Sequence, residues 1–104
     1  MKDLIKALNH YIKEEYSAEG QFVTAQTYTT DRNFKSFRHY KVSLYYVLGG
    51  KTIPIIEDSI TEKYTEETKD LVEINVKIKF MEMVLDFVAS EEFKELMYGR
   101  FDIQ

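Results

Sequence analysis

The stretch Leu71-Val-Glu-Ile-Asn-Val-Lys-Ile-Lys-Phe80 decides the fold that the sequence predicts. Its apolar residues occupy every second position, at Val72, Ile74, Val76, Ile78 and Phe80. Successive side chains of a β-strand point to opposite faces, so this alternation predicts a strand with one apolar and one polar face. A helix would spread the same five side chains around its circumference. We therefore predict a strand over residues 71–80.

Further strands are predicted before this stretch. Residues 21–30 are rich in threonine and β-branched side chains, and residues 39–48 alternate apolar and polar side chains. Gly49-Gly50 then supplies the positive φ angles of a tight hairpin leading into residues 51–56. The expected register pairs Leu48 with Lys51, Tyr46 with Ile53, and Leu44 with Ile55. Pro54 falls opposite Tyr45, which indicates an edge strand or an interrupted one, because proline lacks the ladder N–H.

Helices are predicted at both ends of the chain. The first runs from an N-cap at Asp3 to about residue 16 and ends with Gly20 as a left-handed exit. Helical spacing returns after Phe80, from Met83 onward, and Ser90 is a good N-cap. We therefore expect two helical pieces there, or one helix with a kink near Ala89-Ser90. Residues 57–70 fit a short helix with a Ser59–Glu62 capping box, a loop or an extended chain.

The predicted fold class is α+β. It has an N-terminal helix, an antiparallel sheet of about four strands in a meander with the Gly49-Gly50 hairpin, and a C-terminal helix packed on the same face. The chain has 104 residues, 44% hydrophobic and 31% charged, which fits one globular domain over residues 1–104.

Composition also limits the chemistry. The chain has no cysteine, which excludes disulfides and thiolate catalysis. No apolar run approaches the roughly 18 residues of a membrane span, and no signal peptide is visible, so we expect a cytoplasmic protein without a membrane partner. His10 and His39 are the only histidines, and no ligand spacing surrounds them. We predict no catalytic, metal-binding or cofactor-binding residues, and hence no enzyme, although a site assembled in space stays open.

Two features indicate a partner protein. The polar face of the predicted sheet carries Lys41, Tyr45, Val47 and Thr52, with Thr24 or Gln26, and amphipathic tyrosine rings suit protein contacts. Residues 57–73 hold seven acidic residues against two lysines, a local charge of −5. We therefore predict a small non-enzymatic protein–protein interaction module, an accessory or inhibitory protein of bacterial or phage origin that also forms homodimers. Its predicted partner-binding residues are Tyr45, Val47, Glu57, Asp58, Glu62, Tyr64, Glu66 and Glu67.

An alternative function rests on residues 32–41, where basic and aromatic side chains alternate. This mixture is typical of single-stranded nucleic-acid binding, in which cations follow the phosphates and rings stack on bases. The net charge of −4 argues against it, because nucleic-acid-binding domains usually carry a basic balance. The residues of this alternative are Arg32, Phe34, Lys35, Phe37, Arg38, Tyr40 and Lys41.

Overall fold

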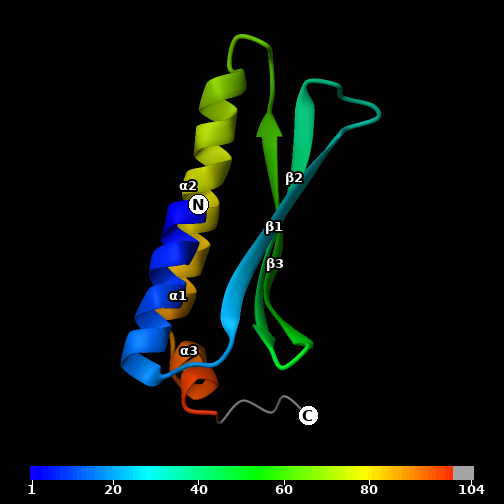
Figure 1. Cartoon of the computed structure of the whole chain (residues 1–104). Helices are drawn as coiled ribbons and strands as arrows, with labels where there is room; N and C mark the ends of the chain where they lie inside the picture. The colour runs from blue at the N-terminus through cyan, green and yellow to red at the C-terminus, as the bar shows by residue number, and fades with distance from the viewer. Residues whose placement is uncertain (100–104) are drawn as a thin grey trace.

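Three helices and three strands make up the fold in a computed structural model, which describes residues 1–99. The elements are α1 (Lys2–Tyr16), β1 (Gln21–Thr30), β2 (Phe37–Leu48), β3 (Lys51–Lys63), α2 (Lys69–Val88) and α3 (Glu91–Met97). The strands form an antiparallel sheet in the order β1-β2-β3. Figure 1 shows α1 and α2 side by side on one side of this sheet. The predicted α+β class is confirmed.

The prediction for residues 71–80 is wrong, because this stretch lies within helix α2. Val72, Val76 and Phe80 are buried, but Ile74 and Ile78 are 53% and 48% exposed on another side of the helix. The described part of the chain therefore has three strands, and not the four expected. The prediction that Thr24 or Gln26 lies on the polar face of the sheet is also wrong. Both residues alternate in step with buried Phe22 and therefore lie on the helix side.

Helical spacing explains the outcome. Val72, Val76, Phe80 and Val84 follow one another at intervals of four, and all four are buried. Residues spaced by four lie on one side of a helix, whereas the alternation at intervals of two ends at Phe80. The helical pattern is thus longer than the strand pattern, and burial of this side against the sheet outweighs the strand preference of its β-branched residues.

The predicted hairpin is confirmed at its turn. Leu48 pairs with Lys51, Tyr46 with Ile53, and Tyr45 with Pro54. Leu44, however, pairs with Ile56 and not Ile55, because an irregularity in the ladder between Leu44 and Tyr45 adds one residue to β3. The third strand also continues to Lys63, so the capping box proposed for residues 59–62 is wrong.

The ends of the helices follow sequence rules with two exceptions. The N-cap of α1 is Met1, with Asp3 in the first turn, and its left-handed exit is Ser17 at φ 52° instead of Gly20. Gly20 has a different role, since its N–H donates to the Tyr46 hydroxyl at 3.2 Å and a Cβ there would collide with the Tyr46 ring. Ser90 caps α3 as predicted, accepting a hydrogen bond from the Phe93 N–H.

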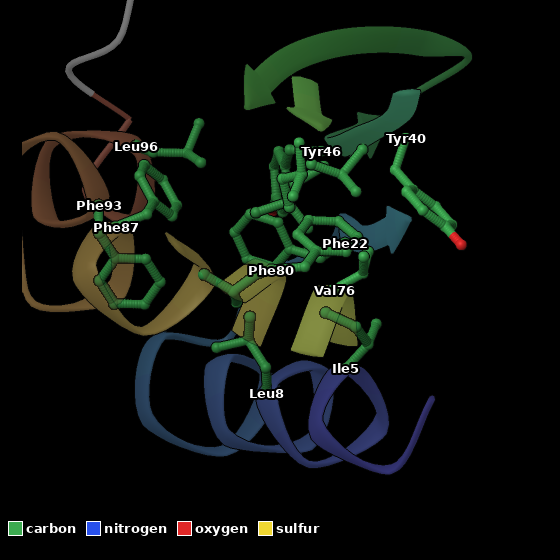
Figure 2. Close-up of a cluster of buried hydrophobic side chains, with 14 of the residues drawn as sticks. Ile5, Leu8, Phe22, Tyr40, Tyr46, Val76, Phe80, Phe87, Phe93 and Leu96 are labelled. Atoms are coloured by element: carbon green, nitrogen blue, oxygen red, sulfur yellow. The ribbon is translucent and has the colours of Figure 1, made fainter. Parts of the chain in front are cut away.

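The core lies between the helices and the sheet. Figure 2 shows Ile5 and Leu8 of α1 pointing toward Val76 and Phe80 of α2 and Phe22 of β1. Aromatic rings fill the end nearest α3, where Phe22, Tyr46, Phe87 and Phe93 pack mostly edge to face or tilted. The other side of the sheet is covered by no helix or strand among residues 1–99.

Candidate functional site

Helix α2 is apolar on two opposite sides. One side is the core side described above, and the second points away from the sheet. Four large side chains on this second side are at least about half exposed: Leu71 at 69%, Ile74 at 53%, Ile78 at 48% and Leu85 at 51%. A surface helix normally carries charged and polar residues on the side opposite the core. This helix therefore keeps an apolar surface that its own fold does not cover.

The exposed residues follow a heptad spacing. With half-buried Met81 and Val88, they occupy positions 71, 74, 78, 81, 85 and 88, at alternating intervals of three and four. This is the a/d spacing that forms a straight apolar seam for packing against another helix. At a rise of about 1.5 Å per residue, the seam is about 25 Å long.

Helix α1 widens this surface on one side. An open groove between the two helices is lined by Leu4, Ala7, Leu8 and Tyr11 of α1 and by Val84, Leu85 and Val88 of α2. Tyr11 is 45% exposed at its edge. We call the combined surface the outer helical face: Leu71, Ile74, Ile78, Met81, Leu85 and Val88 of α2, with Leu4, Ala7 and Tyr11 of α1.

Carboxylates dominate the border of the outer helical face. Residues three or four positions apart are neighbours on a helix surface, which places Asp70 and Glu82 of α2 beside the seam. The same spacing places Asp3 and Glu14 of α1 beside Ala7 and Tyr11. All four are exposed, as is Asp86 one turn beyond Glu82, whereas Lys77 is the cationic side chain nearest the seam. The border is therefore acidic.

The predicted partner-binding residues do not form one surface. Tyr45, Val47 and Glu57 lie on the open side of the sheet, with Glu57 exposed. Asp58 is exposed on β3 but pairs with Val42 on the helix side. Glu66 and Glu67 are exposed in the turn before α2.

The remaining two residues of that prediction are used inside the fold. Glu62 accepts hydrogen bonds from Asn75 Nδ2 at 2.7 Å and Lys79 Nζ at 2.6 Å, which joins β3 to α2. The Tyr64 ring stacks on the Arg38 guanidinium, 3.4 Å from the guanidinium carbon to the ring centre. Glu62 thus holds β3 to α2, and Tyr64 packs the segment after β3 against Arg38 of β2.

Residues 32–41 are divided between two sides of the sheet and a turn. Arg32, Phe34 and Lys35 are exposed in the turn between β1 and β2, Phe37 is half-buried, and Lys41 is exposed on the open side of the sheet. Arg38 and Tyr40 face the helices instead, because they alternate with Lys41 along β2. The structure thus does not gather this set on one surface.

Arg38 is the centre of a polar cluster at the start of α2. Its guanidinium lies between the rings of Tyr28 and Tyr64, 4.1 Å and 3.4 Å from their centres, and 3.6 Å from Glu73 Oε1. The Tyr40 hydroxyl donates to the same Glu73 oxygen at 3.2 Å, and burial raises the pKa of this tyrosine. The cluster satisfies these groups with one another, so it has a structural use.

A second polar cluster closes the turn between β1 and β2. His39 Nε2 lies 2.8 Å from Asp31 Oδ2, and His39 Nδ1 lies 3.0 Å from Thr61 Oγ1. The other Asp31 oxygen accepts the backbone N–H groups of Asn33 and Phe34, both at 2.9 Å. These bonds lower the pKa of Asp31, with the His39 hydrogen bond as the largest cause. The cluster fixes the turn geometry.

Residues 1–99 contain no group of three or more His, Cys, Asp or Glu side chains placed to hold a metal ion. No helix in this range is long and apolar enough to cross a membrane. Compared with protein-family models, with curated proteins and with solved structures, the chain matches none.

Sequence reasoning missed the outer helical face, although the signal was present. The spacing 71, 74, 78, 81, 85 and 88 can be read directly from the sequence once residues 69–88 are taken as one helix. The strand prediction placed Ile74 and Ile78 with Val76 on one buried face, so no apolar residue of this stretch remained for the surface.

Proposed function

We propose that this chain is a non-enzymatic protein–protein interaction module whose outer helical face binds an amphipathic helix of another protein. The observation that carries the proposal is the heptad seam of α2, where Leu71, Ile74, Ile78 and Leu85 remain about half exposed or more. Contiguous exposed apolar surface on a folded protein is typical of interaction sites. A helix lying in a groove is recognised by anchors with this spacing.

The acidic border of the outer helical face determines which kind of partner helix would bind. Asp70 and Glu82 flank the seam on α2, against Lys77 as the nearest cation. Asp3 and Glu14 flank the groove on α1. Like charges placed opposite each other across an interface oppose binding, whereas opposite charges steer the partner into place. The partner proposed here is therefore a helix with an apolar side bordered by Lys or Arg. A second copy would bring acidic borders together on this face.

The role that follows is that of an accessory or inhibitory protein. By covering the apolar side of a basic amphipathic helix, the chain would withhold that helix from other contacts or fix it in one orientation. Glu66 and Glu67, exposed in the turn before α2, add negative charge near its first turn, which extends the attraction for a basic partner.

A synthetic peptide tests this proposal without a known partner. The probe is a helix of about three heptads with leucine at positions a and d and lysine at the others, and its counterpart carries glutamate in place of lysine. We expect fluorescence anisotropy to show binding of the lysine peptide and no binding of the glutamate peptide. Failure of the lysine peptide to bind, or equal binding of both, would contradict the proposal.

Two variants locate the contact. Ile78→Lys places a charge in the middle of the seam, and burying the exposed half of Ile78 is worth about 1 kcal/mol. We therefore expect roughly fivefold weaker peptide binding or more. Thr52→Lys adds the same charge to the open side of the sheet and is expected to leave binding unchanged. Equal losses in the two variants would show that the effect is only electrostatic and that the outer helical face is not the site.

Binding of single-stranded nucleic acid through residues 32–41 stays a second prediction. Retention of a labelled oligonucleotide at low salt, lost when Arg32 and Lys35 are replaced by glutamate, would support it.

A further inference from the structure

Strand β1 is an edge strand without the usual protection. Its ten residues, Gln21–Thr30, include no charged residue and no proline, and their pairing with β2 is regular throughout. The opposite edge, β3, carries Pro54, an irregularity in its ladder and several charged residues. Natural edge strands are normally short, charged, bulged or covered, because unpaired N–H and C=O groups can pair with another chain. The free edge of β1 therefore needs an explanation.

One position of this edge is already closed by α1. The Phe22 N–H donates to Asn9 Oδ1 at 2.7 Å, and Asn9 Nδ2 donates to the Phe22 carbonyl at 3.0 Å. This side-chain amide satisfies the Phe22 main chain as a neighbouring strand would. Since Asn9 approaches from outside the sheet, the bonds also show which main-chain groups of β1 point outward.

Four further residues present their main chain along the same edge. In an antiparallel ladder, alternate residues point their N–H and C=O groups to the same side. Thr24, Gln26, Tyr28 and Thr30 therefore point outward like Phe22. Within residues 1–99, the side-chain and loop hydrogen bonds include none to the main chain of these four residues. These four residues form a continuous free edge that begins next to Phe22, the residue whose main chain Asn9 binds.

The sequence of this edge is self-complementary. An antiparallel pairing of two β1 strands about Thr27 sets Thr24 opposite Thr30 of the second copy and Gln26 opposite its Tyr28. The main-chain groups of all four outward residues are then hydrogen-bonded to the second copy. The ladder stops before Phe22, whose main chain already binds Asn9. On the open side of the sheet, Thr27 meets Thr27, and cross-strand threonine pairs are favourable.

Charge favours a second copy as the occupant. The strand itself has no charge that would repel its equivalent. Like charges directly opposite each other destabilise a strand pair, and none would face another in this ladder.

We propose that β1 pairs with β1 of a second copy of this chain, antiparallel and with its twofold axis at Thr27, so that one sheet runs through both copies. This inference goes beyond the proposed function, because it uses a different surface and a different partner. Each dimer would then hold two outer helical faces, one on each copy.

Cysteine cross-linking tests the pairing, since the chain has no cysteine of its own. In the proposed dimer, Thr27 lies opposite Thr27 of the second copy in a non-hydrogen-bonded pair. The Cα atoms of such a pair are about 4.5 Å apart, which is within the range of a disulfide. Thr27→Cys is expected to form a covalent dimer under mild oxidation. Thr29→Cys is the matched control, because its equivalent in the second copy is about 13 Å away. Equal cross-linking of the two variants would overturn the proposal.

Sedimentation gives the second readout. The unchanged chain is expected to sediment at twice its mass of 12.4 kDa. Thr27→Lys places two lysines together on the axis and should restore the monomer, whereas Thr52→Lys and Ile78→Lys should leave the dimer intact. A monomeric wild-type chain, or a dimer lost with Ile78→Lys and kept with Thr27→Lys, contradicts the proposal. The peptide assay is separate, so failure of one proposal is distinguishable from failure of the other.

Discussion

Two alanine substitutions within one turn of α2, on different sides of the helix, measure how this stretch is folded. Val76→Ala removes two methyl groups from a side chain that is 0% exposed. At about 0.8 kcal/mol for each buried carbon group, and with the cavity left behind, we expect a loss of about 2–3 kcal/mol in the free energy of unfolding. For a domain of about this size, that loss lowers the melting temperature by roughly 10–20 °C.

Ile78→Ala removes one more carbon but from a side chain that is 48% exposed. Alanine is also the better helix former, which offsets part of the lost contact, so we expect a cost of about 1 kcal/mol or less. In a strand, residues 76 and 78 would share one buried face, and the larger isoleucine would cost more. Urea unfolding of both variants at low protein concentration gives the comparison. A greater loss for Ile78→Ala than for Val76→Ala would refute the helical account.

Three further substitutions test local structure. Gly20→Ala should lower the free energy of unfolding by about 1–3 kcal/mol, because its Cβ would collide with the Tyr46 ring, and a thermal melt measures the change. Arg38→Met keeps the apolar stem and removes the guanidinium stacked between two tyrosine rings, so we expect a lower midpoint of urea unfolding. The lowered pKa of Asp31 means that its charge contributes stability above the ordinary value of 3.8, which is lost as the pH falls through the folded pKa. Asp31→Asn should therefore flatten the pH dependence of stability below that value, and an unchanged acid titration would contradict the described contacts.

Local signals in the sequence predicted most of the sheet. The strand over residues 21–30 has the bounds of β1, and the Gly49-Gly50 turn gave the hairpin and its first pairs. Turn chemistry and alternation act over a few residues, which is why they are readable without the rest of the fold. The irregularity between Leu44 and Tyr45 lies beside Pro54, where the sequence predicted an edge or interrupted strand. The extra residue in β3, which moves the partner of Leu44 from Ile55 to Ile56, was not predicted.

The largest failure has a physical reason in residues 71–80. Val72, Val76 and Phe80 satisfy a helix spacing of four as well as a strand spacing of two, and only Ile74 and Ile78 distinguish the two structures. If both isoleucines are assumed to be buried, the strand follows; if they are allowed on the surface, the helix follows. Apolar residues that stay exposed on a helix therefore defeat a rule that assigns apolar residues to the core.

The predicted partner-binding residues were also only partly correct. Tyr45, Val47 and Glu57 were predicted as a partner surface and do lie on the open side of the sheet, but Glu62 and Tyr64 are engaged with α2 and Arg38. Sequence composition showed that residues 57–73 are acidic. It could not show which acidic side chains are occupied by contacts within the fold, because those partners come from residues 13 or more positions away.

A titration followed by methyl NMR tests the central claim most directly. The lysine–leucine peptide is added to the isotopically labelled chain, and the isoleucine and valine methyl signals are monitored. The account predicts that Ile74 and Ile78 shift on binding, while the buried Ile12 and Ile60 stay in place. Unmoved signals from Ile74 and Ile78, with changes instead at Val47 on the open side of the sheet, would contradict it.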